Sequence, residues 1–277
     1  MNFDSIKTKI NIIKKIKTFE EKEYLSILNN LDEIYCNKKN SIFNFSDLNY
    51  ILVEKENFRL FLIENLFRIA NEKAKNKEYK ISIEKIKELN KLIKSSEKEI
   101  KNKIDKLNSF CVIGNYLFDG NKMIENKEFE KAIKYFKNLI ISSKNAKENE
   151  IYKNALTNAK NEFIKSILIE NINLLKLKKY DEIFIKCEEI LKEFQYESKL
   201  KNIISETKKF YKNSLENKIE ENLIKNKICF NELEKYKTLI EMENTNENKI
   251  KDFEEKIKII LQSEKKENQI KIFSKKK

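Results

Sequence analysis

The chain has 277 residues, of which 40% are hydrophobic and 37% are charged, and its formal net charge is +13. It contains no proline, no histidine and only two glycines, Gly114 and Gly120. The composition excludes a disordered tail and predicts an all-α fold, because the strongest helix breakers are nearly absent while enough apolar residues remain for a continuous core.

The first predicted element is a basic amphipathic helix over residues 1–18. Isoleucines recur there at helical spacing, at Ile6, Ile10, Ile13 and Ile16, and five lysines stand against one aspartate. Such a helix either caps a helical array or lies on an anionic membrane. The segment 249–277 has the same character, and we expect a C-terminal capping helix followed by a basic tail.

An aromatic residue then opens one short amphipathic pattern five times, at intervals of 55, 50, 51 and 50 residues. Behind Phe129, for example, apolar residues stand at offsets of 3, 4, 7, 10 and 11, which is one face of an α-helix. A fixed period of this size is typical of repeat proteins. We therefore predict a short helix behind each of these aromatics: Tyr24, Tyr79, Phe129, Tyr180 and Phe230.

Long helices are expected between the short ones, at about 46–75, 97–126, 147–177 and 198–227. Each is near thirty residues, or about 45 Å at 1.5 Å per residue. Polar stretches at 37–41, 142–145 and 243–248 indicate turns between units. The pattern predicts one domain over 1–277, made of about five helix–turn–helix units. Each long segment can be one helix or two, and a three-helix unit of armadillo type stays open.

The third unit resembles a tetratricopeptide repeat, in which small residues let two helices pack closely. The residues that match the spacing of that family are Tyr116, Gly120, Met123, Phe129, Ala132, Phe136 and Leu139. The second and fourth units follow less closely, with Ala70 and Asn171 at the glycine position. The resemblance implies an α-solenoid with a right-handed superhelix. It departs from the family in its period, about 50 residues instead of 34, and in the absence of the closing proline.

Under this resemblance the chain is a non-enzymatic scaffold or adaptor that binds another protein in a concave groove lined by the long helices. Asn71 and Asn121 match asparagines that hold a peptide backbone or terminal carboxylate in some family members, while the apolar lining favours a bound helix or hydrophobic peptide. The alternative is that the apolar residues are core between long helices. The predicted partner-binding residues are Phe67, Asn71, Ala74, Leu117, Asn121, Ile124, Lys165, Leu168, Ile172 and Leu175.

The residues do not indicate a catalytic, cofactor-binding or metal site. Without histidine or a glycine-rich phosphate loop, we expect no catalytic residue, no cofactor and no metal site. Four distant cysteines form no C-x-x-C pair, and the spacing of Cys111 and Cys187 predicts core positions. With no apolar run long enough to span a membrane, we expect a cytoplasmic protein.

The alternative function is non-specific binding to nucleic acid or an anionic membrane surface through the lysine-rich ends. Residues 1–18 and 263–277 carry eight of the thirteen net positive charges. Only two basic residues are arginines, Arg59 and Arg68, which disfavours sequence-specific nucleic-acid recognition because arginine supplies most bidentate base contacts. Self-association through exposed helix edges is a third possibility.

Overall fold

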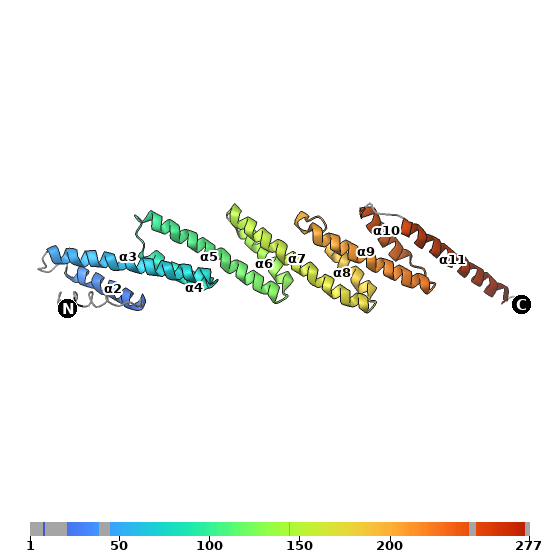
Figure 1. Cartoon of the computed structure of the whole chain (residues 1–277), viewed down its shortest axis with the longest axis horizontal. Helices are drawn as coiled ribbons and strands as arrows, with labels where there is room; N and C mark the ends of the chain where they lie inside the picture. Colours follow the sequence, from blue (N-terminus) through green and yellow to red (C-terminus); the bar gives the residue numbers. More distant parts are fainter. Residues whose placement is uncertain (1–7, 9–20, 39–44, 144, 244–247, 275–277) are drawn as a thin grey trace. The chain divides into compact units, whose positions relative to one another are not determined.

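The computed structural model describes residues 8, 21–38, 45–143, 145–243 and 248–274, and within them the chain is α-helical with no strand (Figure 1). The all-α prediction is confirmed. Most of the predicted helix over 1–18 and the last three lysines lie outside the described residues. The elements are α2 (Glu21–Lys38), α3 (Phe45–Lys75), α4 (Tyr79–Leu92), α5 (Lys98–Glu125), α6 (Phe129–Ser142), α7 (Ala146–Lys176), α8 (Tyr180–Phe194), a 3-10 turn η1 (Ser198–Leu200), α9 (Lys201–Ile224), α10 (Phe230–Glu243) and α11 (Asn248–Ser274).

The recurring aromatic marks the start of the short helices. Tyr79, Phe129, Tyr180 and Phe230 are the first residues of α4, α6, α8 and α10. Tyr24 departs from this pattern, because α2 begins before it, at Glu21. The long segments α3, α5 and α7 are single helices of 31, 28 and 31 residues, whereas the fourth begins with the 3-10 turn before α9. The alternation of long and short helices predicted from the period is therefore present, and three of the four long segments are unbroken.

The turn after each long helix has one repeated geometry. The second residue after the helix takes a left-handed conformation, and the backbone N–H of the residue that follows it donates to the carbonyl five residues earlier, over 2.8–3.0 Å. This is a Schellman motif, which normally uses glycine. The four left-handed residues, spaced by 50, 51 and 48 positions, are Lys77 (φ 62°), Lys127 (φ 62°), Lys178 (φ 55°) and Asn226 (φ 54°).

The chain divides into two compact units, which are larger than the predicted helix–turn–helix repeats. From here on the first unit is Met1–Asp119 and the second unit is Gly120–Lys277, and the boundary between them lies inside α5. In the first unit, α2 and α4 pack against α3. Its core includes Leu62, Leu66, Ile86, Leu89 and Cys111, all at most 1% exposed. The burial of Cys111 confirms its predicted core position.

In the second unit each described helix packs on its neighbours in the chain. α6 lies along α7, α8 contacts α7 and α9, and α10 and α11 contact α9 and each other. One core cluster includes Ile164, Ile190 and Phe194, and another includes Cys187 and Tyr236. This sequential packing is consistent with a helical repeat (Figure 1).

One pair of facing positions, the first on a long helix and the second on the following short helix, recurs with different residues in three repeats. At Gly120 an added Cβ would lie 2.2 Å from Cζ of the buried Phe136, so any larger residue there would have to displace the Phe136 ring. The equivalent pair one period later is Asn171 with Cys187, where the amide Nδ2 donates to Sγ over 3.6 Å. One period earlier it is Ala70 with Ile86, both buried in one cluster.

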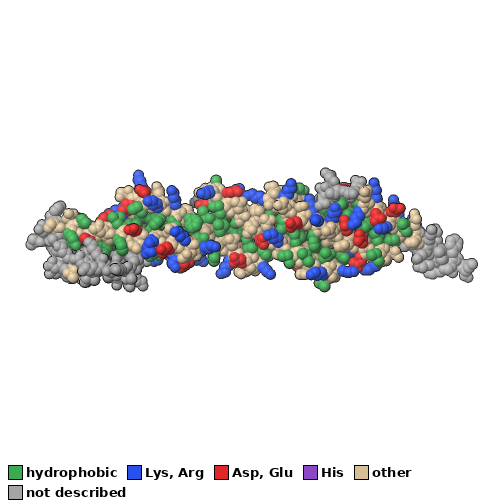
Figure 2. All heavy atoms as spheres, in the orientation of Figure 1, with side chains coloured by type: hydrophobic (Ala, Val, Ile, Leu, Met, Phe, Trp, Pro, Cys, Tyr) green, Lys and Arg blue, Asp and Glu red, His purple; other side chains and the backbone are tan. Residues whose placement is uncertain are grey.

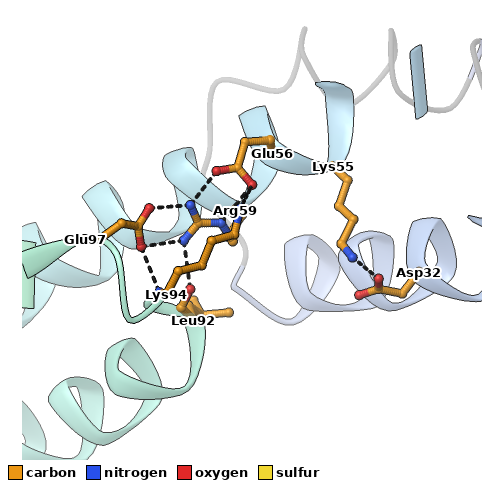
Figure 3. Close-up of polar contacts among 7 residues, drawn as sticks. All are labelled: Asp32, Lys55, Glu56, Arg59, Leu92, Lys94 and Glu97. Atoms are coloured by element: carbon orange, nitrogen blue, oxygen red, sulfur yellow. Dashed lines mark hydrogen bonds and ion pairs between the residues drawn. The ribbon is translucent and has the colours of Figure 1, made fainter. Parts of the chain in front are cut away.

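A buried cation ties α3 to the connection between α4 and α5 (Figure 3). The Arg59 side chain is 7% exposed and donates to Glu97 over 2.5 and 2.9 Å, to Glu56 over 2.5 Å and to the Leu92 carbonyl over 2.8 Å. Hydrogen bonds from Arg59 and Lys94 lower the pKa of Glu56 to about 2.

The same arrangement recurs two periods along the chain. Lys160, itself buried, donates to Glu197 over 2.5 Å, and Glu197 immediately precedes η1 as Glu97 immediately precedes α5. In both places a cation from one long helix holds the start of the next helical segment in its own unit.

Candidate protein-binding surface

Four of the predicted partner-binding residues lie on α7, at Lys165, Leu168, Ile172 and Leu175. Their spacing of 3, 4 and 3 residues places them on one side of the helix. The structure adds Ile169, which is 64% exposed, beside Ile172, which is 47% exposed. We call Leu168, Ile169, Ile172 and Leu175 the α7 stripe.

The two isoleucines of the α7 stripe lie away from the core-facing side of the helix, whereas Leu168 and Leu175 each pack partly on a core cluster. Leu174 points into the core at 8% exposure, and Phe163 and Leu168 both pack partly on a core cluster. Ile172 follows Phe163 by nine residues, which is half a turn of rotation at about 100° per residue. The alternative interpretation, in which these apolar residues are core between long helices, therefore fits the half-buried Leu168 and Leu175. It does not fit the exposed Ile169 and Ile172.

The charge at the edge of the stripe is locally neutralised. Lys165 is exposed and its Nζ lies 2.7 Å from a carboxylate oxygen of Glu162, one turn earlier on the same helix. Exposed pairs of this kind contribute little stability, and the lysine is available to a competing anion on a partner. The stripe is thus an apolar strip bordered by a charged side chain, which is the pattern used by helix-in-groove recognition.

The remaining predicted residues are distributed over both units. In the first unit Phe67, Asn71 and Leu117 are half-buried, and Ala74, at 3% exposure, is part of the core and presents no open side-chain surface. In the second unit Asn121 is exposed and Ile124 is half-buried. The pairing of Asn71 with Asn121 in a carboxylate clamp spans the two units and stays a prediction.

A second surface feature, which sequence reasoning missed, is a groove of about 710 Å³ among α6, α7 and α8. Its apolar residues come from all three helices, and its charged residues come from α6 and α8. We call it the short-helix groove. Its lining residues are Glu130, Ile133, Lys134, Lys137, Phe163, Ile167, Glu189, Ile190, Lys192, Glu193 and Phe194.

Basic and acidic side chains are mixed over the face drawn in Figure 2, and no single basic patch gathers there. In the second unit Lys186 pairs with Glu170 at 2.5 Å, Lys235 with Glu188 at 2.7 Å and Lys249 with Glu216 at 2.6 Å. Such pairing leaves the central lysines less available to phosphates. The alternative function therefore rests on the chain ends, largely outside the described residues.

The buried cysteines are packing groups. Burial raises the pKa of Cys187 to about 12 and also raises the pKa of Cys111, so both thiols stay protonated at neutral pH. Within the described ranges, no three His, Cys, Asp or Glu side chains come together as metal ligands, and no helix has the length and hydropathy to cross a membrane.

Comparison with known proteins found no matching family model, no matching curated protein and no matching solved structure.

Proposed function

We propose that this chain is a non-enzymatic scaffold or adaptor, a tetratricopeptide-like α-solenoid that binds a helix or peptide of another protein on the open faces of its long helices. The observation that carries the proposal is the α7 stripe, where Ile169 and Ile172 are 64% and 47% exposed on a chain that is 37% charged. The repeated Schellman turns and the sequential packing support the repeat architecture that the proposal requires.

The physical reason is the apolar area that a partner would remove from water. Covering the exposed part of each isoleucine contributes about 1–2 kcal/mol, since complete burial of such a side chain contributes roughly 1.5–3 kcal/mol. The half-buried Leu168 and Leu175 extend the strip over two helical turns. An amphipathic partner helix with apolar residues at i, i+3 or i+4, and i+7 matches that length and spacing.

The test is a double variant, Ile169→Lys with Ile172→Lys, in affinity purification with quantitative mass spectrometry. Both side chains point to solvent, so circular dichroism should show unchanged helicity and thermal unfolding. We expect at least a tenfold loss of a specific co-purifying protein.

The matched control is Ile141→Lys, which adds a lysine at the 82% exposed end of α6. It should retain the partner. Equal recovery of all co-purifying proteins with the stripe variant and with wild type would refute the proposal for α7.

The lysine excess at the two ends favours a second candidate, non-specific binding to nucleic acid or to an anionic membrane surface. The two functions differ in their response to salt. Binding through the ends should weaken steeply as salt rises because counterion release supplies its free energy, whereas binding to the apolar stripe should change little. Removal of residues 1–18 should abolish liposome binding only if the N-terminal segment is the membrane contact.

A further inference from the structure

The walls of the short-helix groove carry opposite net charge. On α6, Glu130, Lys134 and Lys137 sum to +1, and on α8, Glu189, Lys192 and Glu193 sum to −1. All six side chains are exposed. The groove therefore has a basic wall and an acidic wall on either side of apolar side chains.

Among the described residues, these six charged side chains have no ion-pair partner. Ion pairs do occur directly beside the groove. On α6, Lys131 pairs with Glu128 at 2.9 Å, and on α8, Lys186 pairs with Glu170 at 2.5 Å. The charges that face the groove are thus open to an external partner.

The floor of the groove is apolar. Phe163 and Ile167 of α7 are half-buried there, between Ile133 of α6 and Ile190 and Phe194 of α8. Near one end, Phe129 packs on Phe163 with ring centroids 6.0 Å apart, and the buried Lys160 lies 5.5 Å from the Phe194 ring. Lys160 is already paired with Glu197 and so supplies no free charge.

The same features disfavour a small polar ligand. Sites for such ligands present a few buried polar groups that converge on the ligand and fix its orientation. Among the lining residues the charged groups stand on the exposed rim, and the buried residues are Ile133, Ile190 and Phe194, which carry no polar side-chain atom. An apolar centre with a charged rim is the anatomy of a protein interface.

From the charge and the shape we infer that the short-helix groove binds an amphipathic helix of a partner protein. The apolar stripe of that helix is flanked by acidic residues on one side and by basic residues on the other. The acidic flank lies against Lys134 and Lys137, and the basic flank lies against Glu189 and Glu193. This site uses the side of α7 that carries Phe163 and Ile167, so it is independent of the α7 stripe.

The test uses three synthetic helical peptides that share one apolar stripe and differ only in their flanks: one acidic and one basic flank, two acidic flanks, or two basic flanks. Binding to the full chain is measured by fluorescence anisotropy at low salt. The peptide with mixed flanks should bind about tenfold more tightly than either of the others, since each rim pair changes affinity by roughly two- to fivefold. The peptide design does not have to fix the direction of the helix in the groove. A peptide with mixed flanks can bind in whichever direction places its acidic flank against the basic wall.

A charge-reversed protein, Lys134→Glu with Lys137→Glu, makes both walls acidic. We expect its preference to switch to the peptide with two basic flanks, by about tenfold. The control reverses two exposed lysines of α7 outside the groove, Lys153→Glu with Lys176→Glu, and should keep the wild-type ranking at the same net charge. The Ile169→Lys, Ile172→Lys protein should also keep it.

Two results would overturn the inference. One is an equal affinity of the wild-type protein for all three peptides, including no binding of any. The other is the same ranking of peptides by wild-type protein and by the Lys134→Glu, Lys137→Glu variant, with both shown to be folded by circular dichroism.

Discussion

Arg59 is a buried residue that joins several segments of the first unit. Its guanidinium donates to two carboxylates, one in α3 and one in the connection between α4 and α5, and to a backbone carbonyl at the end of α4 (Figure 3). Only a planar group with several fixed donors can make these contacts together, which accounts for an arginine in a chain whose other basic residues are almost all lysines.

We expect Arg59→Met to destabilise the first unit by about 2 kcal/mol, because the Glu97 carboxylate, 18% exposed, and the Leu92 carbonyl lose their donor. Arg59→Lys keeps the positive charge but loses the planar set of donors, and it should lower the free energy of unfolding by about 1 kcal/mol. Urea unfolding followed by circular dichroism measures both. An Arg59→Met protein as stable as wild type would show that the pair is not structural.

The same variant has a defined pH dependence. The pKa of Glu56 is lowered to about 2 from an ordinary value near 4.5, so its contribution to stability is present above pH 4.5 and is lost as the pH falls through 2. The stability difference between wild type and Arg59→Met should therefore be full at pH 6 and shrink between pH 4.5 and 2. A difference that stays constant over that range would contradict the assigned ion pairs.

Gly120 and Phe136 should behave as one packing unit. Gly120→Ala normally strengthens a helix by about 1 kcal/mol, but here the new Cβ would overlap the Phe136 ring, and we expect a net loss of about 1–2 kcal/mol. Adding Phe136→Ile installs the combination found at Ala70 and Ile86. The double variant should lose at least 1 kcal/mol less than the sum of the two single variants, and additive losses would argue against direct packing.

At the scale of elements, the Schellman turns are where this chain holds backbone strain. A left-handed conformation costs a non-glycine residue roughly 1–2 kcal/mol, and the chain accepts it at three lysines and one asparagine. The recurrence at the end of four long helices sets the direction in which each short helix starts. The turns thus define the repeat in the backbone itself, independently of side-chain similarity.

Lys127→Gly should stabilise the second unit by about 0.5–1 kcal/mol, because relief of the left-handed strain exceeds the added entropy of the unfolded chain. The matched control is Lys153→Gly, two turns inside the N-terminal end of α7, where the same change should destabilise by about 1 kcal/mol. Thermal unfolding of the two variants separates the effects. A loss of stability in Lys127→Gly comparable to the control would contradict the turn geometry.

Most element boundaries could be predicted from the sequence because two independent signals agree there. The aromatic and the apolar spacing behind it locate the first residue of α4, α6, α8 and α10. The 3-10 turn at Ser198–Leu200 could not be predicted, since it depends on tertiary contacts such as the pair between Lys160 and Glu197. The left-handed conformation of the three lysines could not be predicted either, because lysine is not among the residues that favour turns.

For the whole molecule, the sequence predicted partner-binding residues on α3, α5 and α7 but did not separate the side chains that stay open from those that are buried. Ile172 was predicted and is exposed, Ile169 beside it was missed, and Ala74 was predicted but is buried in the core. Apolar spacing alone cannot separate a core face from a docking face when both occur on one helix. The short-helix groove escaped detection because its Lys and Glu residues look, in the sequence, like any solvated helix face.

The measurement that most directly tests the proposed scaffold function is site-specific photo-crosslinking in the native cell. A photoreactive phenylalanine analogue is placed at position 172 in the α7 stripe or, as the comparison, at position 141, which is more exposed at 82%. We predict one discrete protein adduct from position 172 that disappears with Ile169→Lys, and none from position 141. The same adducts from both positions, or none from position 172, would contradict the assignment of the α7 stripe as a partner-binding surface.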